Sequence, residues 1–72
     1  MLNNKNEIQL EGEVIEFLPN TTFRVQTQEG RLYLCTMAGR MRLNRIRILP
    51  GDRVRFVSSP YDDGKGRIVY RL

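Results

Sequence analysis

Apolar and polar residues alternate with a period of two along most of this chain. Between Ile8 and Val14 every second position is apolar or glycine, and the positions between them carry glutamine or glutamate. A period of two is typical of a half-buried β-strand, because successive side chains of a strand point to opposite faces. The sequence therefore predicts five short strands, at residues 8–14, 23–27, 32–37, 53–56 and 67–72.

The phase of the alternation predicts which side chains face the core. It turns four apolar side chains of the second and fourth strands inward, namely Phe23, Val25, Val54 and Phe56. In the last strand it places Tyr70 on the same face as Ile68, opposite Arg67. We expect these apolar sets to meet inside one small barrel.

Two irregularities interrupt the first strand. Gly12 lies in its interior, which indicates a bend or a close approach of another backbone. After Val14 the alternation slips, since Ile15 and Phe17 are apolar out of phase, and a β-bulge would explain the slip. Turns and loops are predicted where glycine, proline and asparagine gather, at residues 19–20, 29–30, 50–52 and 58–66.

Residues 38–49, here called the arginine segment, follow a different pattern. The part from Ala38 to Leu43 tolerates one or two helical turns, which Asn44 could end in a left-handed conformation. The second part alternates again, which would turn Ile46 and Ile48 inward and the arginines beside them outward. The segment carries four arginines, Arg40, Arg42, Arg45 and Arg47. In a helix the first two would point about 200° apart, so together they could reach several phosphates.

The order of three strands, a short helix and two more strands predicts an all-β fold. In 72 residues this order is typical of a five-stranded OB-fold, a Greek-key barrel with a short helix between strands 3 and 4. An SH3-like barrel is the nearest alternative, although it seldom needs an insertion at that point. We expect one domain over residues 1–72, with residues 1–6 frayed.

The charge distribution indicates a nucleic-acid partner. Residues 1–30 hold two basic and five acidic residues, a net charge of −3, whereas residues 31–72 hold ten basic and three acidic residues, a net charge of +7. Ten of the twelve basic residues are arginine, whose guanidinium forms two-pronged hydrogen bonds with phosphate. The alternative interpretation is a solvated surface that happens to be rich in arginine.

Catalytic and metal-binding groups are scarce. The chain has no histidine and one cysteine, Cys35, so it lacks the commonest general base, a zinc ligand set and an internal disulfide. Glu11 and Glu13 share a strand face and are best interpreted as solvated, and Cys35 as a packing residue. Gly64-Lys65-Gly66 lacks the spacing of a phosphate-binding P-loop. We expect no enzyme activity, no cofactor and no metal, and the polar start of the chain predicts no secretory signal or membrane span.

OB-type barrels bind single-stranded or irregular nucleic acid with aromatic rings on the sheet and cations on the rim. The candidate rings are Phe17, Phe23, Tyr33 and Tyr61, of which Phe23 belongs to the core by its phase. Six aromatic residues are too few for a wide stacking surface. Phosphate contacts should therefore supply most of the affinity and make it depend on salt.

Several motifs share their spacing with one known family over residues 8–71. They are Leu10-Glu11-Gly12, Leu18-Pro19-Asn20, Phe23-Arg24-Val25, Gly39-Arg40-Met41-Arg42 with Asn44, the run Ile46 to Val54, Pro60-Tyr61-Asp62, and the run Lys65 to Arg71. Together they resemble translation initiation factor one of bacteria and plastids, which is similar to the S1-like OB-folds. Two positions depart from that family, since Arg45 often has a non-basic counterpart and Thr36 replaces a histidine.

The resemblance implies a protein that binds the decoding (A) site of the small ribosomal subunit. There it would contact ribosomal RNA, a ribosomal protein of the decoding centre and the other initiation factors, block premature entry of tRNA and assist selection of the initiator. We expect a monomer, in the bacterial cytoplasm or, if the source is a plastid, the chloroplast stroma. Two other functions stay open: a general single-stranded RNA binder or RNA chaperone of the cold-shock type, and a protein–protein adaptor that uses the acidic first strand.

Eleven residues are predicted to bind RNA, on the grounds of charge, exposure or a matching family motif. They are Arg40, Met41, Arg42, Asn44, Arg45, Arg47, Tyr61, Lys65, Gly66, Arg67 and Arg71. No RNA contact is transferred to residues 1–6, because they differ from the usual short lysine-rich start.

Overall fold

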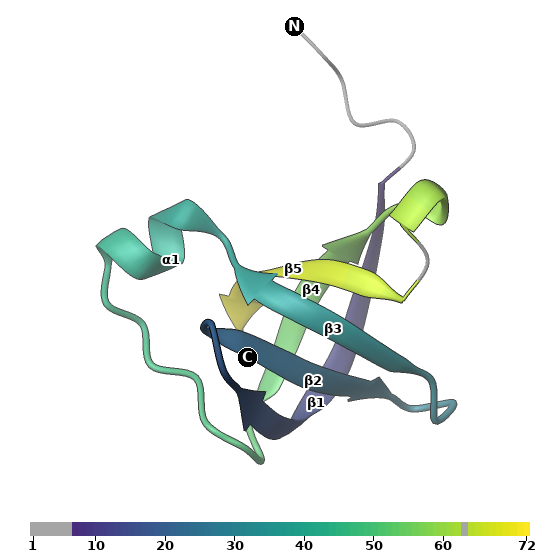
Figure 1. The fold of residues 1–72 in the computed structure, drawn as a ribbon, viewed down its shortest axis with the longest axis horizontal. Helices are drawn as coiled ribbons and strands as arrows, with labels where there is room; N and C mark the ends of the chain where they lie inside the picture. The colour runs from purple at the N-terminus through teal and green to yellow at the C-terminus, as the bar shows by residue number, and fades with distance from the viewer. Residues whose placement is uncertain (1–6, 63) are drawn as a thin grey trace, which may run out of the picture.

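Five strands close into a barrel in the computed structural model, which describes residues 7–62 and 64–72 (Figure 1). The predicted frayed start, residues 1–6, lies outside the described residues. No helix in the described part is long and apolar enough to cross a membrane. In chain order the elements are β1 (Ile8–Leu18), β2 (Thr22–Thr27), β3 (Leu32–Met37), α1 (Gly39–Leu43), β4 (Arg53–Ser58), the 3-10 helix η1 (Pro60–Asp62) and β5 (Lys65–Arg71).

The strand order around the barrel is β1-β2-β3-β5-β4, and β4 pairs with β1 to close it. All neighbours are antiparallel except β3 and β5, which are parallel. A parallel pair cannot be joined by a tight hairpin, and here the connection runs through α1, the rest of the arginine segment and β4. This is the predicted OB-fold, with its short helix between strands 3 and 4, and the prediction is confirmed.

Strand β1 serves both sides of the barrel, because its first half pairs with β4 and its second half pairs with β2. The predicted bulge is confirmed by a register shift between Val14 and Glu16. Gly12 pairs with both neighbours, and a Cβ added there would lie 2.6 Å from the Gln26 carbonyl oxygen and 2.8 Å from Val25 Cγ1. The close backbone approach predicted at this glycine is therefore present.

Most core side chains come from alternate positions of β1 to β4, as the period of two predicts, and the arginine segment and β5 supply the rest. The fully buried ones are Val14, Val25, Cys35, Val54, Phe56 and Ile68. Tyr33 is 6% exposed, and its ring centroid lies 5.0 Å from that of Phe56. Tyr33 shares the inner face of β3 with Cys35. The prediction that Tyr33 could be an exposed ring for stacking on bases was therefore wrong.

The last strand departs from its predicted phase. A register shift between Arg55 and Phe56 in the β4–β5 ladder keeps Ile68 inside but turns Tyr70, opposite Arg55, outward. Tyr70 is 54% exposed, so the prediction that it shares the inner face with Ile68 was wrong. A bulge re-aims side chains in this way because one strand gains a residue relative to its partner. The predicted loop 58–66 is also shorter than expected, since β4 extends to Ser58 and η1 follows it.

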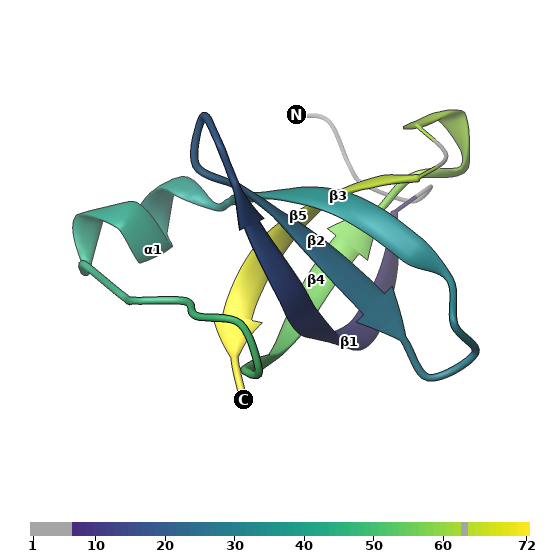
Figure 2. The ribbon, with the colours of Figure 1, turned by 60° about the horizontal axis from the view of Figure 1, so that its bottom comes forward.

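The arginine segment leaves the barrel at the end of β3 as helix α1 (Figure 2). Asn44 has φ −86°, so the prediction that it would be left-handed was wrong; Arg45, with φ 55°, takes that conformation. The Arg45 N–H donates to the Arg42 carbonyl at 3.1 Å and the Ile46 N–H to the Met41 carbonyl at 3.0 Å. These two bonds form a Schellman motif, which places the left-handed residue one position after the C-cap.

The second part of the arginine segment is extended but pairs with no strand in the described residues. Ile48 is buried and Ile46 packs against the core, as the alternation predicted. Pro50 and Gly51 then turn the chain into β4, and Gly51 has φ 98°. This part of the segment is therefore held to the barrel by apolar side chains and by the hydrogen bond from Arg71 to the Arg47 carbonyl, without a strand ladder.

Candidate nucleic-acid interface

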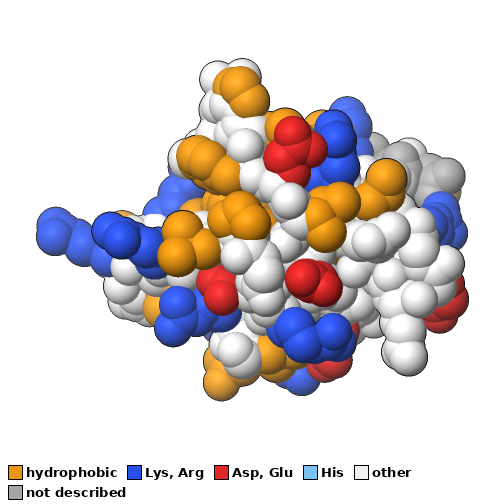
Figure 3. Space-filling view, turned by 90° about the horizontal axis from the view of Figure 1, so that it is seen from below, with side chains coloured by type: hydrophobic (Ala, Val, Ile, Leu, Met, Phe, Trp, Pro, Cys, Tyr) orange, Lys and Arg blue, Asp and Glu red, His pale blue; other side chains and the backbone are white. Residues whose placement is uncertain are grey.

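Four arginine side chains project from the arginine segment at one end of the barrel, and all four residues are exposed: Arg40, Arg42, Arg45 and Arg47. Seen from below, Lys and Arg side chains protrude from the end that carries α1 (Figure 3). None of the four forms an ion pair with a carboxylate of the described residues. Their charge is therefore available to an external anion.

The barrel positions these arginines through backbone and apolar contacts. Met41 is 4% exposed, so α1 is anchored by the side chain between Arg40 and Arg42. The Ala38 N–H donates to the Ile68 carbonyl at 2.8 Å, which fixes the start of the helix on β5. Because the methionine of this short helix is buried, its neighbours on either side must point outward.

A hollow of about 450 Å³ lies between α1 and the end of β5. Its lining comes from α1, the residues after it and β5: Arg40, Met41, Asn44, Ile46, Val69, Tyr70 and Arg71. Two hydrogen bonds hold its cations: Arg40 Nη2 donates to the Val69 carbonyl at 3.3 Å, and Arg71 Nη1 donates to the Arg47 carbonyl at 2.9 Å. Apolar side chains beneath two guanidiniums can accommodate the ring of a base beside its phosphate.

This first hollow brings together four of the predicted residues, Arg40, Met41, Asn44 and Arg71. Tyr70 was not predicted as a site residue. The bulge that turns it outward does not change the alternation of apolar and polar residues along β5. Ile46 and Val69, which also line this hollow, were not predicted as site residues. The alternation had indicated only that Ile46 faces the core. Met41 contributes its buried side chain, so we expect it to support the surface more than to contact a ligand.

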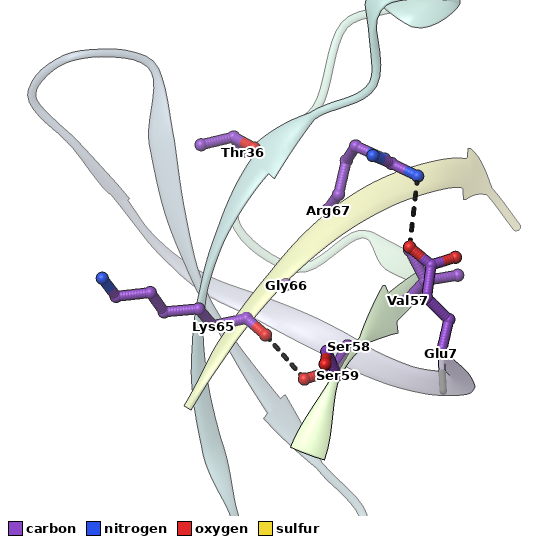
Figure 4. A pocket seen from close by; sticks show the side chains of 8 residues that line it. All are labelled: Glu7, Thr36, Val57, Ser58, Ser59, Lys65, Gly66 and Arg67. Atoms are coloured by element: carbon purple, nitrogen blue, oxygen red, sulfur yellow. Dashed lines mark hydrogen bonds and ion pairs between the residues drawn. The ribbon is translucent and has the colours of Figure 1, made fainter. Parts of the chain in front are cut away.

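A second hollow, of about 230 Å³, lies at the start of β5 (Figure 4). It brings together the predicted Lys65, Gly66 and Arg67, with five residues that the sequence reasoning missed: Glu7, Thr36, Val57, Ser58 and Ser59. The Ser58 hydroxyl donates to the Lys65 carbonyl at 2.6 Å. A Cβ on Gly66 would lie 2.8 Å from Phe56 Cδ2, so this glycine is explained by packing on the core.

The exposed rings do not form one platform. Tyr61 is 81% exposed and lies in η1, at the opposite end of β5 from α1, and it lines neither hollow (Figure 1). Phe17 is half-exposed and packs on Phe23, with ring centroids 5.1 Å apart. Tyr70 belongs to the first hollow. The surface of the described residues therefore offers separate rings and not a row for stacking successive bases.

Arginines on the barrel wall differ from those of the arginine segment. Arg24 Nη1 lies 2.9 Å from Glu16 Oε1, and Arg55 Nη2 lies 3.0 Å from Glu11 Oε2. The Arg55 guanidinium also lies over the Tyr70 ring, 5.7 Å from its centroid. Glutamates of β1 therefore neutralise part of the wall, and Glu11 is engaged in an ion pair.

Burial raises the pKa of the Cys35 thiol to about 12, because an apolar interior disfavours the thiolate. The side chain is fully buried, so it neither contacts solvent nor ionises near neutral pH. Cys35 thus has the surroundings of a packing residue and not those of a reactive thiol.

The sequence matches the family described as Translation initiation factor 1A / IF-1 over residues 1–72. The solution structure of a translation initiation factor of this type, from the Wolbachia endosymbiont strain TRS of Brugia malayi, is 40% identical, with a TM-score of 0.79 over 94% of this chain and 80% of that one. The crystal structure of YjeQ from Thermotoga maritima is 33% identical, with a TM-score of 0.74 over 90% of this chain and 23% of that one. YloQ, a circularly permuted GTPase, is 20% identical with a TM-score of 0.74, over all of this chain and 25% of its own, and shows a shared fold alone. The match over the whole sequence and the likeness to the solved Wolbachia factor show that this chain belongs to the translation initiation factor 1A / IF-1 family.

Proposed function

We propose that this initiation factor binds the decoding (A) site of the small ribosomal subunit through phosphates of the ribosomal RNA. There it blocks premature entry of tRNA and, with the other initiation factors, assists selection of the initiator. The observation that carries the proposal is the set of four exposed arginines at one end of the barrel, with no carboxylate partner among the described residues. Such a surface attracts a polyanion, and membership of the family points to the ribosome as its source.

The proposed mechanism is binding and exclusion, without catalysis. Arg40 and Arg42 lie on either side of the buried Met41, so their guanidiniums diverge and can reach phosphates of different nucleotides. Arg45 and Arg47 extend the contact along the chain, and Lys65, Arg67 and Arg71 can extend it along β5. A rigid barrel that occupies the site in this way would block a tRNA sterically.

The proposed setting is a monomer in the bacterial cytoplasm, or in the chloroplast stroma if the source is a plastid. Its partners would be the small-subunit RNA, a ribosomal protein of the decoding centre and the other initiation factors. Chemical footprinting of the small-subunit RNA, with and without this protein, tests the location directly, because protection should concentrate at the A site.

The loop assignment is tested by the double variant Arg40→Ala with Arg42→Ala. Loss of two charge-assisted contacts should weaken binding to isolated small subunits by roughly tenfold or more. The plot of log affinity against log salt should flatten by about 1.4–1.8, since each phosphate contact contributes about 0.7–0.9.

The matched control is Arg24→Ala with Arg55→Ala, which removes the same charge from two arginines already paired with glutamates. This control should bind nearly as the wild type does. Equal losses in both double variants would show that overall charge, and not the arginine segment, governs binding, and the proposal would be wrong.

The cold-shock alternative is tested by comparing affinity for an unstructured RNA with affinity for small subunits. The separate positions of Phe17, Tyr61 and Tyr70 favour folded RNA, because a general single-strand binder stacks successive bases on neighbouring rings. We expect a clear preference for subunits. Equal affinities would support a general RNA binder instead.

A further inference from the structure

One ion pair in the described residues differs from the other two. The pairs Arg24–Glu16 and Arg55–Glu11 have hydrogen-bond length, 2.9 and 3.0 Å. Arg67 Nη2 lies 3.8 Å from Glu7 Oε2, which is beyond hydrogen-bond distance. This third pair is therefore attracted by charge alone and is the easiest of the three to separate.

The third pair lies at the rim of the second hollow, and Figure 4 shows the Glu7 carboxylate facing the Arg67 guanidinium there. Lys65 and Arg67 are two residues apart on β5, so their side chains leave the same face of the strand. Thr36 of β3 lies opposite Arg67 in the parallel register and adds a hydroxyl to the lining. Figure 4 shows the Lys65 side chain running away from the Arg67 guanidinium, so Arg67 is the cation that Glu7 faces at this hollow.

Glu7 is the carboxylate among the residues that line this hollow. Lys65 forms no ion pair within the described residues, whereas Arg67 has Glu7 beside it. A phosphate that approaches Arg67 must therefore displace a carboxylate from it.

We propose that Glu7, at the rim of the second hollow, competes with RNA phosphate for Arg67. The inference rests on the proposed RNA-binding function. The Glu7 carboxylate occupies the place of a phosphate oxygen while RNA is absent, and an incoming phosphate displaces it. Because the pair is partly exposed, the competition reduces affinity only modestly, by about two- to fivefold.

The test is a double-mutant cycle of Glu7→Gln and Arg67→Gln, with a 12-nucleotide oligouridine and, separately, isolated small subunits as probes. Glu7→Gln keeps the shape of the side chain and removes its charge, so it should bind both probes about two- to fivefold more tightly. In the Arg67→Gln background the same change should have no effect, because the cation for which Glu7 competes is gone.

Glu13→Gln is the matched control, since it removes one negative charge from β1, the strand that begins directly after Glu7. Glu13 lies opposite Arg53 in the β1–β4 register and lines neither hollow, so it does not compete for Arg67. Any gain in affinity from Glu13→Gln should therefore be smaller than that from Glu7→Gln and equal in both backgrounds. Urea unfolding of each variant verifies that it is folded, and Glu7→Ala provides a second way to remove the carboxylate.

An unchanged affinity for Glu7→Gln, or an equal gain in the Arg67→Gln background, would overturn the inference while leaving the proposed function intact. Failure of the wild type to bind small subunits would instead refute the proposed function, and the inference with it.

Discussion

Gly12 occupies a position that a larger residue cannot take. It pairs with Thr27 on one side and with Val54 on the other, where β1 passes from one half of the barrel to the other. Its missing side chain lets the β2 backbone approach closely, as the 2.6 Å distance from a hypothetical Cβ to the Gln26 carbonyl oxygen shows. A methyl group at residue 12 would collide with the β2 backbone, so the close pairing of β1 and β2 at this point requires glycine.

The variant Gly12→Ala tests this dependence. The added methyl group must displace backbone, so we expect the free energy of unfolding in urea to fall by about 1–3 kcal/mol. Gly39→Ala is the matched control, because nothing lies within 4 Å of its added Cβ and the position is helical. That control should gain up to about 1 kcal/mol. Equal stabilities of the two variants would contradict the close approach.

At the scale of elements, helix α1 and its C-terminal turn show how stability and binding can oppose each other. The Schellman motif needs a left-handed residue, and Arg45 fills that position with φ 55° although glycine is favoured there. A side chain costs conformational energy in this region, while the guanidinium adds charge to the proposed binding surface. If the proposed interface is right, Arg45 serves binding at some expense of folding stability, which is a prediction that can be tested.

Arg45→Gly should therefore change stability and binding in opposite directions. We expect the free energy of unfolding to rise by about 1 kcal/mol, because the left-handed strain is removed. The salt dependence of binding to small subunits should flatten by about 0.7–0.9, the contribution of one phosphate contact. Arg47→Ala, which removes a charge from an ordinary conformation, should flatten the salt dependence without the gain in stability. A loss of stability in Arg45→Gly would contradict this account.

At the scale of the whole molecule, the charges are sorted by the fold. Acidic residues at the start of the chain and along β1 pair with the barrel-wall arginines Arg24, Arg55 and Arg67. The end that carries the arginine segment has no such compensation within the described residues. The modest net charge of +4 therefore becomes a strongly positive surface at one end of the barrel.

This distribution predicts the salt dependence of the wild type. Contacts from the four arginines of the segment alone correspond to a slope of log affinity against log salt of about −3, and adding the three cations of β5 extends it to about −6. The slope is measured by titrating labelled protein onto small subunits at several salt concentrations. A slope shallower than about −1 would show that the affinity comes from uncharged contacts and would contradict the interface.

Much of the fold could be predicted from the sequence, because strand faces depend on local alternation alone. The period of two identified Val25, Val54 and Phe56 as core, and the slip after Val14 identified the bulge. The lone helical stretch between strands three and four then selected the OB topology. The arginine segment was visible for the same reason, since its four cations are close in sequence.

Only the tertiary structure decided the features that depend on register between strands distant in sequence. Tyr70 faces outward because the register of β5 against β4 shifts between Arg55 and Phe56. Tyr33 faces inward because the barrel turns the face of β3 that carries Tyr33 and Cys35 toward the core. The approach of Glu7 to Arg67 joins two residues from opposite ends of the chain, so no local pattern could reveal it. Alternation along one strand determines which side chains share a face, whereas contacts across the barrel follow from how separate strands align.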